Sequence, residues 1–195
     1  MVIDIGTDSS CKTYSEAEGW QTFPSLPGSR IGHCQVSNGS DTFVTGGIWT
    51  GLNTVHATVW RISDGDSSWT TLPPLNTARF HHACAFLGGK LYAIAGAGGR
   101  HPWPSLHSVE IYDPEANSWT FGPEMPKVLS YINAIVHQDV LYVFGGIPSG
   151  VATPMIAIYK LTADSKTWEF VDEVKLVRGR GIDPAFTIDT LYNCK

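Results

Sequence analysis

Seven histidines and four cysteines are the residues of this 195-residue chain that could hold a metal ion. A zinc site needs three or four such ligands to converge, and cysteine ligands often come in close pairs such as C-x-x-C. No two of these cysteines stand in such a pair, so we expect no metal and no cofactor. The histidines are His33, His56, His81, His82, His101, His107 and His137, and the cysteines are Cys11, Cys34, Cys84 and Cys194.

Nucleophilic catalysis would need a Ser, Cys or Thr in a strained, glycine-flanked turn, with a base and an acid to orient it. The stretches Gly28-Ser29-Arg30 and Pro148-Ser149-Gly150 are ordinary turn sequences. A carboxylate pair for glycoside chemistry can converge from distant loops, and the sequence leaves that alternative open. The acidic residues, however, fall mostly in turns such as Asp64-Gly65-Asp66, where they cap the backbone. We therefore predict a protein that is not an enzyme.

Two of the histidines belong to a repeated pattern. His33 and His82 each come three residues after an arginine, Arg30 and Arg79, in equivalent places about fifty residues apart. Repetition of this kind favours a structural role in each unit over a single shared site. His101 and His107 fall in the longest predicted loop, where we expect solvated side chains.

Four tryptophans reveal the repeat that must position these residues. Trp20, Trp69, Trp119 and Trp168 are separated by 49, 50 and 49 residues. Before each of the last three stands a short apolar run that ends in glycine, as in Leu141 to Gly146. A period near fifty residues is typical of propellers and related repeat proteins. The repeated positions are Gly46, Gly47, Trp69, Gly96, Trp119, Gly145, Gly146 and Trp168, and we assign the last three tryptophans to the core.

One unit divides into four short strands separated by turns. Strand propensity and turn residues place them at Phe80–Phe86, Leu91–Ala95, Ser108–Tyr112 and Ser118–Phe121. Gly88-Gly89 suits a tight hairpin turn. Four such strands make one antiparallel sheet, which must stack against its neighbours to bury both faces. No helix is predicted, and 165–176 is predicted as strand and loop.

The repeat resembles the kelch motif: a glycine doublet after an apolar strand, then an aromatic residue such as Tyr112 or Trp60, then a Trp seven to nine residues later. The resemblance covers essentially the whole chain. It departs from the pattern in the second unit, where Gly96-Ala97 replaces the doublet. It departs again in the third unit, where Leu129 and Ile132 replace the arginine and histidine. The resemblance implies an all-β kelch-type β-propeller of four-stranded blades. Some kelch propellers are copper-radical oxidases, but nothing here marks that ligand set.

The sequence predicts one propeller domain over 1–195, with repeat units at 1–20, 21–69, 70–119, 120–168 and 169–195, of which the first and last are partial. The glycine-ended strand occurs five times and the Trp strand four times. We expect about four blades as an incomplete arc of a larger, six-bladed propeller. In the alternative, the two ends close a four-bladed ring.

The loops after the glycine-ended strands vary between units, and loops on a rigid scaffold often carry binding residues. Trp and Arg dominate interaction hot spots. We therefore predict partner contacts from these loops, with the alternative that Trp49 and Trp103 fold down as packing plugs. The predicted contact residues are Trp49, Arg100, His101, Trp103 and Met155.

Composition narrows the class of partner. Thirteen basic and eighteen acidic side chains give a net charge of −5, with no basic cluster to follow a phosphate backbone. No run approaches the eighteen apolar residues of a membrane helix, and no leader is apparent at the N-terminus. We therefore expect a protein partner, neither nucleic acid nor membrane, and slightly favour the cytoplasm.

The predicted function is a non-catalytic protein-interaction module. The resemblance implies a further role, since kelch proteins often recognise substrates for ubiquitin ligases. The alternative is a secreted propeller that binds or processes carbohydrate, for which Asn38-Gly39-Ser40 would be a glycosylation sequon.

Overall fold

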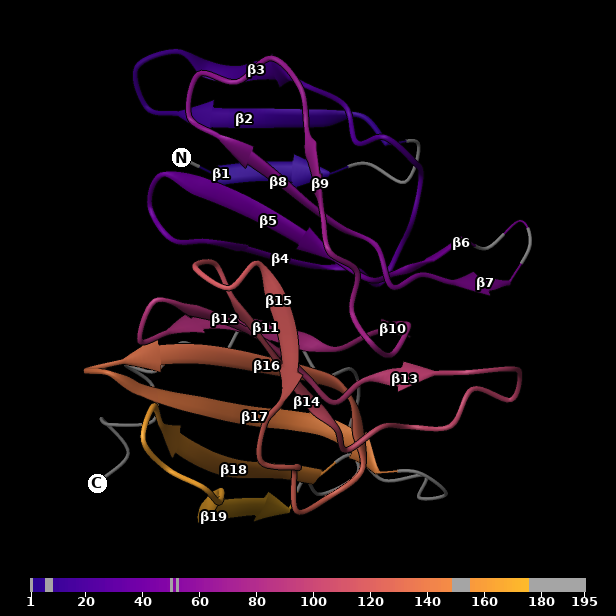
Figure 1. Ribbon diagram of the computed structural model, residues 1–195, viewed down its shortest axis with the longest axis vertical. Helices are drawn as coiled ribbons and strands as arrows, with labels where there is room; N and C mark the ends of the chain where they lie inside the picture. Colours follow the sequence, from indigo (N-terminus) through magenta and orange to yellow (C-terminus); the bar gives the residue numbers. More distant parts are fainter. Residues whose placement is uncertain (1, 6–8, 50, 52, 149–154, 176–195) are drawn as a thin grey trace.

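The computed structural model describes residues 2–5, 9–49, 51, 53–148 and 155–175, and all regular structure in these ranges is β-strand. One three-stranded and three four-stranded antiparallel sheets follow one another along the chain. We call them blades I to IV. Figure 1 shows them stacked along the long axis of the molecule, from blade I in indigo to blade IV in orange and yellow. Within these ranges, no helix is long and apolar enough to cross a membrane.

Each blade is built from strands that follow one another along the chain, and two small two-stranded sheets, β6–β7 and β10–β13, lie beside the blades. Blade I contains β1 (Val2–Ile5), β2 (Cys11–Ser15) and β3 (Gly19–Phe23). Blade II contains β4 (Cys34–Ser37), β5 (Asp41–Thr45), β8 (Val59–Ser63) and β9 (Thr70–Leu72). Blade III contains β11 (Ala83–Leu87), β12 (Lys90–Ile94), β14 (Val109–Asp113) and β15 (Ser118–Phe121). Blade IV contains β16 (Leu129–His137), β17 (Val140–Pro148), β18 (Met155–Thr162) and β19 (Glu169–Lys175).

The predicted all-β repeat is confirmed, with two local differences. Gly88 (φ 57°) and Gly89 (φ 75°) form the tight turn expected between β11 and β12. The run Phe80–Phe86 is not one strand, because His81 adopts φ 50° and separates β10 (Arg79–Phe80) from β11. In blades II to IV, the fourth strand also extends beyond the Trp at which the predicted unit ends.

Three hydrophobic clusters form the core, and each fills the space between two neighbouring blades. The cluster between blades II and III, for example, joins Phe43, Val59 and Leu75 to Leu91 and Trp119. A single sheet therefore buries its faces only by contact with the next, as expected of a repeat architecture. Corresponding clusters lie between blades I and II and between blades III and IV.

The repeated tryptophans join consecutive blades through a side-chain hydrogen bond. The indole Nε1 of Trp69 donates to the carbonyl of Pro24 at 2.8 Å, that of Trp119 to Pro73 at 2.9 Å, and that of Trp168 to Pro123 at 2.8 Å. Each acceptor follows the last strand of the preceding blade. The three indoles are 8–9% exposed, whereas Trp20 of blade I is 56% exposed. The predicted core role of Trp69, Trp119 and Trp168 is thus what the structure shows.

Candidate binding face

The glycine doublet follows the second strand in blades II and III and lies within β17 in blade IV. In blades II and III it brings the chain close to the next blade. Gly47 (φ 99°) donates its N–H to the carbonyl of Arg79 at 2.8 Å, and Gly96 (φ 92°) donates to Leu129 at 3.0 Å. A Cβ at Gly96 would lie 2.6 Å from the Cβ of His82. Glycine is therefore required here both for its backbone angle and for the close approach of the segment that enters β11 of the same blade.

The doublet of the second unit is Ala95-Gly96, which corrects the predicted alignment to Gly96-Ala97. The φ values of Gly46, Ala95 and Gly145 are 61°, 52° and 80°, and those of Gly47, Gly96 and Gly146 are 99°, 92° and 108°. Alanine is tolerated at the first place because its φ lies in the left-handed helical region, which non-glycine residues reach at moderate cost. The second place needs a larger φ and keeps glycine.

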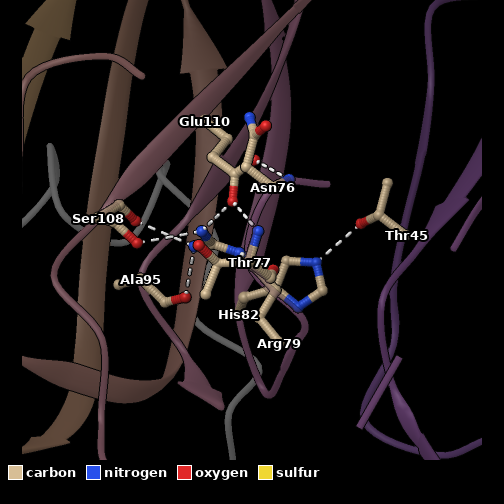
Figure 2. A network of polar contacts seen from close by, with 8 residues as sticks. All are labelled: Thr45, Asn76, Thr77, Arg79, His82, Ala95, Ser108 and Glu110. Carbon is tan, nitrogen blue, oxygen red and sulfur yellow. Dashed lines mark hydrogen bonds and ion pairs between the residues drawn. The ribbon is translucent and has the colours of Figure 1, made fainter. Parts of the chain in front are cut away.

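Arg79, at the start of blade III, is fully buried and surrounded by acceptors. Its guanidinium donates to the carbonyls of Ala95 (2.9 Å) and Ser108 (3.0 Å) and forms an ion pair with Glu110 at 2.7 Å. Glu110, also fully buried, accepts the backbone N–H groups of Asn76 (2.6 Å) and Thr77 (2.9 Å). Figure 2 shows this network closing around the guanidinium. Every partner lies in blade III or in the segment that enters it.

Arg30 occupies the equivalent place in blade II, with a different partner. It donates to the carbonyl of Gly46 (2.8 Å) and to the hydroxyl of Thr58 (2.6 Å), and its guanidinium lies 3.6 Å from the ring centre of Trp60. A cation–π contact thus replaces the carboxylate. Burial lowers the pKa of Arg30 to about 10. In blade IV, buried Leu129 takes the place of the arginine.

His82 joins blades II and III from within the core. It is 5% exposed, and its Nε2 lies 2.7 Å from the hydroxyl of Thr45 on β5. Burial, the charge of Arg79 and then the neighbouring His33 and His81 hold the pKa of His82 well below its usual value. Burial and Arg30 likewise lower the pKa of His33. Both histidines are therefore neutral near pH 7 and occupy equivalent places in blades II and III, and for His82 the bond to Thr45 is a contact between blades.

The loops beyond the glycines extend from one side of the molecule. Figure 1 shows the hairpin of β6 (Ile48–Trp49) and β7 (Thr54–Val55), together with β10 and β13 (Ala97–Gly98), on the same side. Ile48, Phe80 and Ala97 form a small buried cluster at their base. This base anchors the loops, so the residues at their tips are held on a fixed support.

The predicted contact residues occupy different environments in these loops. Trp49 is 44% exposed, and Arg100 and His101 are also exposed. Trp103 is half-buried and packs edge-on against Phe80, with ring centres 5.5 Å apart. Its indole Nε1 is buried, and no described residue accepts a hydrogen bond from it. Met155 begins β18 and is described only by its backbone.

A second group of residues on this side was not predicted. Gly32, His81 and Tyr131 occupy equivalent places in blades II, III and IV, all with positive φ. His81 donates its N–H to the carbonyl of Gly32 (2.7 Å), and Tyr131 donates to His81 (2.9 Å). The rings of His81 and Tyr131 stack with centres 3.8 Å apart. The shared fifty-residue spacing could have identified this row.

The row forms part of a cavity of about 420 Å³ lined by the first strands of the three blades. Its walls include Gln35, Cys34 and Cys84, the last two joined by a disulfide. Nδ1 atoms of His33, His81 and His82 are buried without a hydrogen-bond partner among the described residues. The described part of the chain contains no group of three or more His, Cys, Asp or Glu side chains arranged to hold a metal ion.

Comparison with known proteins matches this chain to a repeat family and to human proteins. The Kelch motif family matches residues 78–126. Kelch-like protein 35 of Homo sapiens is 32% identical over 140 residues, which cover 70% of this chain and 22% of that protein. Kelch-like protein 33 of Homo sapiens is 38% identical over 132 residues, which cover 65% of this chain and 24% of that protein.

The chain thus spans about a quarter of the length of these curated relatives. Among solved structures, that described as the structure of YjhT matches with a TM-score of 0.68 and 13% identity. The match covers 84% of this chain and 52% of the other. At this identity, the likeness concerns the fold alone.

Proposed function

This chain is built of kelch repeats on a propeller fold, and from that premise we propose that it is a non-catalytic module that binds a protein partner through the loop side of its blades. The observation that carries the proposal is a set of exposed apolar side chains near the glycine doublets of blades II and IV. They are Ile31 (36% exposed), Trp49 (44%), Tyr131 (55%) and Ile147 (40%). Their immediate neighbours Ile48 and Phe80 are buried.

Such side chains suit the centre of a protein interface. Aromatic residues are enriched in interface hot spots, and they expose apolar surface that a partner would cover. Arg100 and His101 add polar groups at the edge of the same side. The resemblance to Kelch-like proteins extends the proposal to substrate recognition for a ubiquitin ligase, a role that the whole protein would perform.

Site-specific photo-crosslinking tests this proposal. A photoreactive amino acid replaces Trp49 or Arg100 in the chain, and, as a control, Phe121, which is 63% exposed on the last strand of blade III. We expect one protein to be crosslinked from positions 49 and 100, with crosslinking competed by unlabelled chain and absent from position 121. Equal crosslinking from all three positions would contradict a partner site on the loop side.

A second function is favoured by one specific pair of observations. Cys34 and Cys84 form a disulfide, and Asn38 is exposed in the turn between β4 and β5. Disulfides and glycosylated asparagines are features of secreted proteins. A secreted, carbohydrate-binding propeller would carry a glycan on Asn38, which peptide mass spectrometry detects. Unmodified Asn38 in protein isolated from its natural source would remove this candidate.

A further inference from the structure

One disulfide joins two blades of the described chain. Cys34 lies on β4 and Cys84 on β11, the first strands of blades II and III. Their separation of 50 residues is one repeat, and β16 of blade IV has Ala134 at the corresponding place. The bond therefore connects equivalent points of consecutive blades. We propose that it is a redox-active cross-link, which thiols open and close in the folded protein through the cavity that it lines.

Access to the bond is provided by the cavity. Both cysteines belong to its wall, together with His33 and His82. Cys34 is half-buried, whereas Cys84 is 7% exposed. Because Cys34 is the more exposed of the two residues, we assign the first attack by an entering thiolate to its sulfur. The cavity volume of about 420 Å³ is ample for the thiol end of a small dithiol.

The reaction is a two-step exchange with a dithiol as the reductant. The first thiolate attacks Sγ of Cys34, the Cys34–Cys84 bond breaks, and Cys84 leaves as a thiolate that takes a proton. The second thiolate of the dithiol then attacks the dithiol sulfur that is bonded to Cys34. Cys34 leaves as a thiolate and takes a proton. Two electrons pass to the protein, which gains two protons, and the dithiol becomes a cyclic disulfide. Oxidised glutathione reverses the sequence.

Non-covalent contacts keep the two blades together when the bond is open. Phe43 of blade II packs edge-on against Phe86 of blade III with ring centres 5.0 Å apart. The Thr45–His82 and Gly47–Arg79 hydrogen bonds cross the same boundary. The reduced protein is thus expected to stay folded while β4 and β11 gain freedom. These strands follow the Gly32–His81 contact, so the cross-link stiffens the cavity and the side of the molecule next to it.

The test uses the full chain and does not require a partner. The protein is incubated with dithiothreitol or with oxidised glutathione under native conditions, alkylated and analysed by peptide mass spectrometry, with hydrogen exchange and thermal unfolding measured in parallel. Opening should make Cys34 and Cys84 alkylatable, add about 2 Da to the intact mass and accelerate amide exchange in β4 and β11. Because the bond closes a loop in the unfolded chain, opening it should lower the midpoint of thermal unfolding by roughly 10 °C.

Two variants separate the cross-link from other thiols. Cys34→Ser should lose every response to dithiothreitol, whereas Cys11→Ser, which removes the buried thiol outside the disulfide in blade I, should respond like the parent chain. If Cys34→Ser does not fold, the reduced parent chain supplies the same comparison. The proposal is wrong if dithiothreitol opens the bond only at the rate of global unfolding, or if oxidised glutathione does not restore it. Either result leaves the proposed partner site on the loop side unaffected.

Discussion

Trp60 and Glu110 stand at the same register position of blades II and III, and each contacts the buried arginine of its own blade. Trp60 pairs with Val44, and Glu110 pairs with Ala93, on equivalent strands. One position therefore satisfies a buried guanidinium in two ways, through an aromatic face or through a carboxylate. In blade IV the same position is Tyr159, opposite Val143, and no arginine is present at Leu129. Consecutive blades thus have the same backbone arrangement, while the charged groups buried in them differ.

Replacing Glu110 by Gln should strongly destabilise the chain. The change leaves the guanidinium of Arg79 buried without a counter-charge, which costs roughly 3–5 kcal/mol. Urea unfolding followed by tryptophan fluorescence measures the loss. Arg79→Met combined with Glu110→Gln should cost less than the sum of the single changes. Lys90→Met, at the exposed Lys90–Asp113 pair, should leave the urea midpoint nearly unchanged. A loss of stability equal to that of Glu110→Gln would show that burial of the ion pair does not determine the cost.

Trp119→Phe should lower stability much more than Trp20→Phe does. The first change removes the hydrogen bond to Pro73 and part of a buried indole, at a combined cost of about 2–3 kcal/mol. Trp20 occupies the same repeat position and is 56% exposed, so its change should cost less than about 0.5 kcal/mol. Chemical denaturation of both variants makes the comparison. Similar losses would show that the indole position, rather than the contact between blades, determines stability.

Gly96→Ala should be far more damaging than Gly39→Ala. Both glycines have strongly positive φ, 92° and 108°, so both variants carry backbone strain. Only at Gly96 does the new Cβ meet His82, whereas nothing lies within 4 Å at Gly39. We expect about 1 kcal/mol for Gly39→Ala and at least about 2 kcal/mol more for Gly96→Ala. The difference in thermal midpoint isolates the close contact between Gly96 and the segment that enters β11 of the same blade, and equal midpoints would exclude it.

Stability should decline as the pH falls below about 6.5, the ordinary value for histidine. His82 is neutral in the folded chain because burial and Arg79 lower its pKa. Below pH 6.5 the unfolded chain takes up a proton that the folded chain does not, so acid favours unfolding, by about 1.4 kcal/mol per pH unit for one such group. His82→Gln should reduce this slope, while His33 still contributes. Exposed His137→Gln is the control, and an unchanged slope in His82→Gln would contradict the assignment.

The repeat could be predicted because its determinants are local. The spacing of Trp69, Trp119 and Trp168 and the glycine-ended strands fixed the period, the fold class and the core tryptophans. The break at His81 was missed, because an apolar-leaning run does not reveal one residue in a left-handed conformation. Ala95 was missed as the first residue of the second doublet for a similar reason, since alanine usually avoids positive φ.

The features that depend on contacts between distant residues were not predicted. Nothing in the local pattern of Ser108–Tyr112 indicates that Glu110 is fully buried, because its burial depends on the charge of the distant Arg79. The sequence left the state of the cysteines open. In retrospect, the 50-residue separation of Cys34 and Cys84 equals the repeat and places them side by side on neighbouring blades. Comparing each residue with its counterparts in the other units, rather than with its sequence neighbours, would have identified both the buried position of Glu110 and the pairing of Cys34 with Cys84.

The hydrogen bonds from the tryptophans to the prolines also give the propeller a direction of growth. In each of the three pairs, the acceptor carbonyl belongs to residues synthesised about 45 positions before the donor indole. A blade that leaves the ribosome therefore meets a neighbour whose docking groups are already in place. Domains generally fold N-terminal first during synthesis, and in repeat proteins folding propagates from one repeat to its neighbour. The order of these contacts allows each new blade to add to a finished one, so that few apolar faces wait uncovered during translation.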